Sequence, residues 1–181
     1  MTLSPRDRLV ETASRLFYAE GIHTVGVDRL VTEAGVTRAT FYRHFRTKDD
    51  LVAEYLRSQH ERVRSGVDSA RTGRSGRDAL VSVVDFVAEE TCGHDFRGCP
   101  FINAAAEYPD PAHPVRQVIS AHRAWFHDEL RKLAADAGHP DPDHAAGVLV
   151  LLRDGALAGG ELDDPAVVSQ TLRRAIRDVT R

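Results

Sequence analysis

The residues best suited to recognition chemistry lie on a short segment that follows a glycine-containing turn. Their side chains can all hydrogen-bond, and they are Thr37, Arg38, Thr40, Tyr42, Arg43 and His44. Such side chains contact phosphate oxygens, and an arginine can also form a bidentate pair with guanine. The segment therefore predicts contact with DNA.

Two short helices and the turn between them must position these side chains. We expect the first helix over Val27–Ala34, a tight turn at Ala34-Gly35-Val36, and a second helix over Arg38–Phe45 with Thr37 as its N-cap. This is the helix-turn-helix plan, which places its second helix in the major groove. Arg38 and Thr40 fall near the start of that helix, where base edges come within reach.

The remaining chain shows only helical patterns. Ser4 is a plausible N-cap for a helix over Pro5–Glu20 that ends at Gly21. Further helices are predicted over about 48–71, 77–91, 101–107, 115–137, 143–160 and 164–180. The prediction is an all-α fold of about nine helices. The segment 143–160 is apolar almost all round, with Gly155 and Gly159 four apart, so one side should face the core and the other a partner helix.

Composition and charge narrow the class of protein. The 181 residues carry a net charge of −3 at pH 7, but residues 1–64 have 11 basic and 9 acidic residues. A mildly basic head on an acidic body suits contact with phosphates at one end only. Two cysteines fit a reducing cytosol, and neither a signal peptide nor a membrane-length apolar run is visible. We therefore expect a cytoplasmic protein.

The N-terminal ~55 residues resemble the tetracycline-repressor (TetR) family of bacterial transcription regulators. The matching positions are Ala13, Leu16-Phe17, Gly21, Val27, Leu30, Ala34-Gly35-Val36-Thr37, Tyr42, His44-Phe45, Lys48 and Leu51. One departure is Val25-Gly26, where the family usually carries a Thr/Ser pair. Gly26 can still cap a helix without a side-chain oxygen, so the motif survives.

The resemblance implies a DNA-binding head over residues 1–47 and a ligand-binding and dimerisation body over residues 48–181. It implies a homodimer through the last two helices, at about 143–160 and 164–180, bound to a near-palindromic operator. Tyr42, His44 and Lys48 would mainly hold phosphates. The expected function is a ligand-responsive regulator, most simply a repressor released by a small molecule, with no cofactor, no metal and no catalytic activity.

Candidates for a ligand pocket come from the middle of the chain. The apolar, aromatic and polar residues that could line it are Phe86, Cys99, Phe101, Ile102, Asn103, Glu107, His122, Trp125 and Phe126. Most of the apolar members are expected to be core. The segment around Gly98-Cys99 and Asn103 resembles that of a subgroup of the same family.

Three alternatives remain open. Cys99 precedes Pro100 at a predicted helix start, where a lowered thiol pKa would allow sensing of oxidants or electrophiles. The favoured alternative is that Cys99 is a small buried apolar residue. Cys92, His94 and Cys99 lack the compact spacing of structural zinc sites. An enzyme with a helix-turn-helix head is disfavoured, because no segment supplies a nucleophile with a base, a phosphate loop or paired carboxylates.

Overall fold

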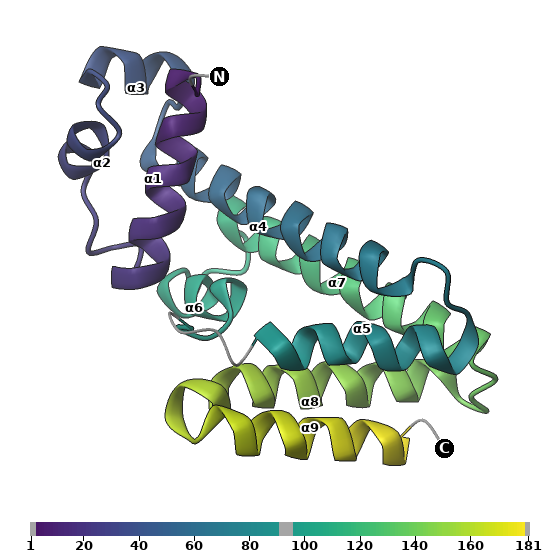
Figure 1. Cartoon of the computed structure of the whole chain (residues 1–181). Coiled ribbons are helices and arrows are strands. Elements are labelled where there is room, and N and C mark those ends of the chain that lie inside the picture. Colours follow the sequence, from purple (N-terminus) through teal and green to yellow (C-terminus); the bar gives the residue numbers. More distant parts are fainter. Residues whose placement is uncertain (1–2, 91–95, 180–181) are drawn as a thin grey trace. The chain divides into compact units, whose positions relative to one another are not determined.

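The computed structural model describes residues 3–90 and 96–179, apart from the side chain of Glu90, and these ranges form nine helices and no strand (Figure 1). They are α1 Pro5–Glu20, α2 Val27–Glu33, α3 Arg38–His44, α4 Lys48–Arg71, α5 Gly76–Glu90, α6 Pro100–Glu107, α7 Pro114–Asp136, α8 Pro142–Leu162 and α9 Pro165–Val179. The all-α prediction is confirmed. None of the helices in the described ranges is long and apolar enough to cross a membrane.

The chain divides into two compact units that do not follow the order of the sequence. One unit is formed by Met1–His60 with Pro100–Ser120, and the other by Glu61–Cys99 with Ala121–Arg181. The helix α6 therefore belongs to the same unit as α1, α2 and α3. The chain leaves this unit along α4 and returns to it at Pro100.

In the first unit, local signals set the ends of α1 and its apolar stripe sets the packing. The Ser4 hydroxyl accepts a hydrogen bond from the Asp7 amide at 3.2 Å, and Gly21 ends the helix with φ of +88°. The helix α1 packs against both α2 and α3. The buried side chains that join them include Leu9, Ala13, Leu16, Phe17, Leu30, Phe41 and Phe45. These side chains form the core that fixes the recognition segment.

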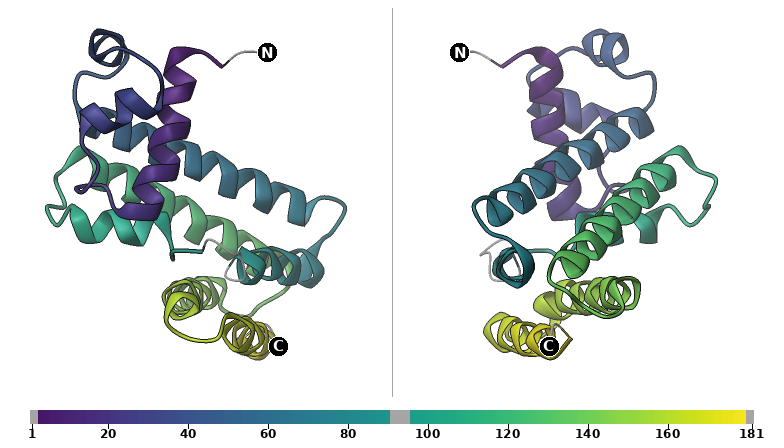
Figure 2. Two further views of the ribbon diagram at one scale, coloured as in Figure 1. Left: turned by 60° about the vertical axis from the view of Figure 1, so that its left-hand side comes forward. Right: turned by 90° about the vertical axis from the view of Figure 1, so that its right-hand side faces the viewer.

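In the second unit, α8 and α9 lie side by side, as both views of Figure 2 also show, and α5 packs against α9. Gly159 of α8 packs against Val168 of α9. A Cβ added at Gly159 would lie 3.6 Å from Cγ2 of Val168, so the glycine lets the two helices approach closely. Gly155 has no atom within 4 Å of that position, and Leu151 is 71% exposed. One face of α8 is therefore buried in the unit and another is open.

The ring of Phe86 in α5 packs directly against the backbone of α4 at Gly66, which is possible because glycine has no side chain. A Cβ at position 66 would lie 2.2 Å from Cζ of Phe86, whose ring packs against the apolar core of this unit. We expect Gly66→Ala to displace the ring and lower the free energy of unfolding by about 1–3 kcal/mol, measured by urea denaturation. Adding Phe86→Leu should recover part of the loss. An unchanged urea midpoint in the single variant would show that the ring moves without cost.

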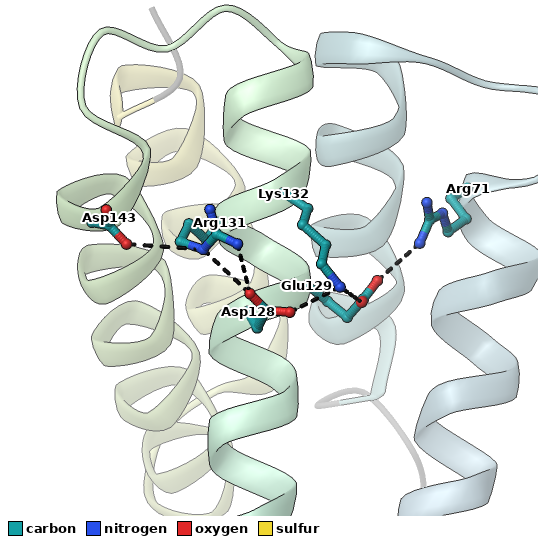
Figure 3. A network of polar contacts seen from close by, with 6 residues as sticks. All are labelled: Arg71, Asp128, Glu129, Arg131, Lys132 and Asp143. Carbon is teal, nitrogen blue, oxygen red and sulfur yellow. Dashed lines mark hydrogen bonds and ion pairs between the residues drawn. The ribbon is translucent and has the colours of Figure 1, made fainter.

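A network of charged side chains connects α4, α7 and α8 on the surface of the second unit (Figure 3). Glu129 accepts from Arg71 at 2.8 Å and from Lys132 at 3.0 Å, while Asp128 pairs with Lys132 and Arg131, both at 2.8 Å. The Lys132 hydrogen bond, followed by that of Arg131, lowers the pKa of the Asp128 carboxyl. Because most of these groups are solvated, the network contributes little stability, and the apolar core holds the helices together.

Candidate nucleic-acid interface

The turn between α2 and α3 is a Schellman motif built on Gly35. The Val36 amide donates to the Val31 carbonyl at 3.0 Å, and the Gly35 amide donates to the Thr32 carbonyl at 3.2 Å. Gly35 has φ of +61°, a conformation in which a side chain is strained. The predicted turn at Ala34-Gly35-Val36 is thus confirmed, and it fixes the direction in which the chain enters α3.

The start of α3 is held by Thr37 and Thr40. The Thr37 hydroxyl oxygen accepts a hydrogen bond from the Thr40 amide at 3.1 Å, and the two hydroxyl oxygens lie 2.9 Å apart. The predicted N-cap is therefore confirmed. Gly26 likewise occupies the N-cap of α2 without a side-chain hydrogen bond, as expected from the sequence. Both short helices thus begin at defined positions.

The two faces of α3 differ sharply in exposure. Phe41 is fully buried, whereas Tyr42 is 48% exposed and Arg43 and His44 are exposed in the last turn. Arg38 is also exposed, and its Nη1 lies 3.1 Å from Oδ1 of Asp28 in α2. An exposed ion pair of this kind has an interaction free energy of at most about 1 kcal/mol. The guanidinium can therefore leave Asp28 at little cost and bind another partner.

Lys48 differs from the other predicted DNA contacts because it already has partners within the fold. Its ammonium donates to the Ile22 carbonyl at 2.5 Å and lies 5.8 Å from the centroid of the Phe17 ring. Burial lowers the pKa of this half-buried group. Lys48 therefore joins the start of α4 to the end of α1, and its contact with phosphate stays a prediction.

Ion pairs missed by the sequence analysis tie α1 to α2. Arg29 of α2 forms hydrogen bonds to Glu20 of α1 and, at 2.9 Å, to Glu33 of its own helix. Arg15 of α1 also pairs with Glu33. The only signal in the sequence was the i,i+4 spacing of Arg29 and Glu33. Because these pairs are exposed, they add little stability and at most help to orient α2 against α1.

The end of α6 contacts the loop that follows α1. The Glu107 carboxylate accepts hydrogen bonds from the backbone amides of Ile22 at 2.7 Å and His23 at 2.6 Å. The next residue, Tyr108, donates from its hydroxyl to Oδ1 of Asp49 at 2.7 Å. Burial, and then this hydrogen bond, raise the pKa of the Tyr108 phenol, which stays a donor.

Glu107→Gln tests how far this contact stabilises the first unit. A neutral amide offers one acceptor oxygen, so one backbone amide loses its partner and the other loses a charge-assisted bond. We expect the free energy of unfolding to fall by about 1–3 kcal/mol in urea denaturation. Glu11→Gln, on the exposed side of α1, should change it by less than about 0.5 kcal/mol. Equal effects of the two variants would contradict a stabilising role for Glu107.

Comparisons with known proteins agree with this geometry. Residues 9–55 match the family model of bacterial regulatory proteins, tetR family. The crystal structure of a TetR-family transcriptional regulator from Streptomyces coelicolor is 47% identical, with a TM-score of 0.94 over 98% of this chain and 94% of that chain. The chain belongs to the TetR family. It is a DNA-binding transcriptional regulator of this family.

Two further comparisons support the assignment to the TetR family. A TetR-type transcriptional regulator structure from Streptomyces avermitilis is 32% identical, with a TM-score of 0.82, over 97% of this chain and 99% of that chain. The HTH-type transcriptional regulator LmrA of Bacillus subtilis is 24% identical over 136 residues, which is 70% of this chain and 71% of LmrA. These relatives are regulators, so the helix-turn-helix head does not serve an enzyme.

The residues predicted to line a ligand pocket in this TetR-family chain fall into both units. Phe101, Ile102, Asn103 and Glu107 belong to the first unit, and Phe86, Cys99, His122, Trp125 and Phe126 to the second. In the second unit the rings of His122, Trp125 and Phe126 have centroids between 5.8 and 6.4 Å apart. Phe101, Cys99, His122 and Phe126 are buried. Their contact with a ligand stays a prediction.

The hypotheses of a reactive thiol and of a metal site involve Cys99, which the structure describes, and Cys92 and His94, which it does not. Cys99 is 2% exposed, and its Sγ lies 3.6 Å from Nη2 of the buried Arg153. Cys92 and His94 lie outside the described residues. Within the described ranges, no group of three or more His, Cys, Asp or Glu side chains could hold a metal ion.

Proposed function

We propose that this TetR-family regulator is a repressor that binds a specific operator as a homodimer and releases it when a small molecule binds its body. The observation that carries the DNA-reading part is the exposed Arg38 in the first turn of α3, next to the N-cap Thr37. A guanidinium in this place can reach the edge of a base in the major groove.

The other exposed groups of α3 suit contact with the DNA backbone. We assign Thr40 to the base edge beside Arg38, and Thr37, Tyr42, Arg43 and His44 to phosphates. This division is supported by their order along the helix, because residues near the N-terminus of a recognition helix enter the groove first. Lys48 would act mainly by fixing the start of α4, with a secondary contact to a phosphate.

The last two helices are the proposed dimer interface. An open groove of about 590 Å³ lies along α8 and α9, and its lining includes Leu152, Gly155, Gly159 and Val168. Leu151, Leu162 and Val167 add exposed apolar surface, at 71%, 82% and 57% exposure. A second copy of the same two helices would bury this surface around a two-fold axis. The dimer would place two recognition helices about 34–36 Å apart, one turn of DNA.

The proposed switch depends on a difference in affinity between two states. A ligand that prefers the DNA-incompetent state shifts the population towards it and thereby weakens operator binding. The Glu107 contact supports a role for α6 in this change, because any movement of its C-terminus acts on the backbone at Ile22 and His23.

We favour non-covalent sensing over the alternative of a switch at Cys99. A thiol that is 2% exposed is shielded from oxidants and electrophiles, and this burial favours the structural role. Cys99→Ser should therefore retain both operator binding and release. Loss of the response in that variant, together with dithiothreitol-reversible release by oxidant in the wild type, would favour the covalent switch instead.

The experiment that tests the proposed function is selection of bound duplexes from a random DNA library, followed by binding assays across salt. We expect a near-palindromic motif, and an affinity for it about a thousand-fold or more above that for random DNA. Sedimentation equilibrium on the same sample should give the mass of a dimer. Equal affinity for selected and random duplexes would refute specific regulation.

A further inference from the structure

A buried arginine lies in the middle of α8. Arg153 is 8% exposed and is surrounded by the apolar core of the second unit. A guanidinium keeps its charge under all ordinary conditions. Burying such a charge costs free energy unless it is paired and hydrogen-bonded. The partners of Arg153 therefore decide how far its buried charge is compensated.

Those partners leave the charge only partly compensated. Nη1 of Arg153 donates to Oδ1 of Asp154 at 2.9 Å, and Nη1 of Arg123 pairs with the other oxygen of the same carboxylate at 2.7 Å. One carboxylate thus serves two guanidinium groups, and the three side chains carry a net charge of +1. Within residues 3–90 and 96–179, the remaining contacts of Arg153 are neutral. Nη2 faces Sγ of Cys99 at 3.6 Å, and the guanidinium lies 5.0 Å from the centroid of the Phe126 ring. A thiol is a weak acceptor.

Arg153 also lines a small cavity. The other residues around it are apolar and come from α5, α7, α8 and α9: Val83, Val84, Val87, Phe126, Leu130, Leu149, Leu172 and Ile176. Its volume of about 10 Å³ is enough for roughly one water. The lining, apolar except for one cationic group, has the composition of a ligand site, although the space is far smaller than a ligand pocket. A larger ligand requires the surrounding side chains to separate.

We propose that this cavity is the effector site and that the effector is a small carboxylic acid with an apolar body. The inference rests on the proposed ligand-responsive function. The carboxylate pairs with Arg153 in place of the Cys99 thiol, which completes the compensation of the charge. The apolar body separates α5 and α9 side chains, so the acid selects an opened state of this unit. That selection supplies the difference in affinity that a switch requires.

The chemistry of the site discriminates between classes of ligand. A neutral apolar molecule of the same shape would enter the same space but leave the net positive charge in place. A cation would add to the repulsion between Arg153 and Arg123. Only an anion gains from the guanidinium, and a carboxylate matches its fork geometry with two parallel hydrogen bonds.

Trp125 supplies a direct test, because it is the chain's single tryptophan and its ring centroid lies 6.0 Å from that of Phe126. The full chain is titrated, without DNA, with phenylacetate and hexanoate and with their neutral amides, phenylacetamide and hexanamide. We expect the acids to change the tryptophan fluorescence saturably and to raise the melting temperature. The amides should bind at least about tenfold more weakly. Equal binding of acid and amide, or no saturable response to either acid at millimolar concentration, overturns the proposal.

Matched variants place the effect at Arg153. Arg153→Met removes the charge at similar volume and should weaken phenylacetate binding by about tenfold or more, whereas Arg123→Met, which leaves the Asp154 carboxylate to Arg153 alone, should weaken it clearly less. Equal losses in the two variants count against the site. If Arg153→Met does not fold, the comparison of acid with amide in the wild type decides.

Binding of the selected operator in the absence of acid tests the proposed function separately. Operator binding without any response to acids removes this inference alone, and acid binding without operator binding removes the proposed function.

Discussion

Phe41→Ala is expected to lower the free energy of unfolding by about 3–5 kcal/mol, measured by urea denaturation. The ring is fully buried, with its centroid 5.2 Å from that of Tyr42 and 5.9 Å from that of Phe45. Its removal leaves a cavity between α3 and the rest of the head. Because whole domains are stable by only about 5–15 kcal/mol, this loss is a large fraction of the total.

Tyr42→Ala is the matched control for Phe41→Ala. Its ring is adjacent on the same helix but 48% exposed, so its removal should cost less than about 1 kcal/mol of stability. The same change should weaken DNA binding, since the hydroxyl and the ring face solvent where the backbone of DNA would lie. A stability loss in Tyr42→Ala as large as that in Phe41→Ala would contradict the division of α3 into a core face and a DNA face.

Arg38→Ala is expected to reduce the discrimination between operator and random DNA by about 1–3 kcal/mol, or roughly 5- to 150-fold. The free energy of the exposed pair with Asp28 is at most about 1 kcal/mol, so breaking or reorienting it costs less than a base contact gains. Competition binding with selected and random duplexes measures the effect. The loss should be concentrated at one position in each half-site.

Arg43→Ala supplies the comparison on the same helix with the same residue type. If Arg43 binds a phosphate, its loss weakens all duplexes alike and reduces the slope of log affinity against log salt by about one. Asp28→Asn should change discrimination only in the presence of Arg38, which a double-mutant cycle would show. If Arg38→Ala weakens selected and random duplexes equally, Arg38 contacts the backbone and does not read a base.

The parts of the fold that the sequence predicted depend on local rules. Ser4 and Thr37 cap their helices, Gly35 turns the chain, and Pro5 begins α1, all as expected from their neighbours alone. The burial of Phe41 and Phe45, four apart on one face, follows from the spacing of one amphipathic helix. Local hydrogen bonds and helical periodicity decide these features, so no distant residue had to be known.

The parts that the sequence analysis missed depend on residues far apart in the chain. Glu107 was named only among residues that could line a ligand pocket, and its hydrogen bonds from the amides of Ile22 and His23, more than 80 residues earlier, were not predicted. No periodicity encodes such a pairing. Arg153 did carry a signal, since it is a charged residue that directly follows the apolar run of residues 145–152 within one predicted helix. Its partners Cys99 and Phe126, however, become visible only in the folded unit.

The return of the chain to the first unit at Pro100–Ser120 has a consequence for building hybrid regulators. A head transferred as residues 1–60 alone would leave the amides of Ile22 and His23 without their carboxylate acceptor, and Asp49 without the Tyr108 hydroxyl. A chimera that combines this head with another body therefore needs residues 100–120 as part of the transplant. The exchangeable module of this protein is discontinuous in sequence, and its three crossover points lie within α4, directly before α6 and within α7.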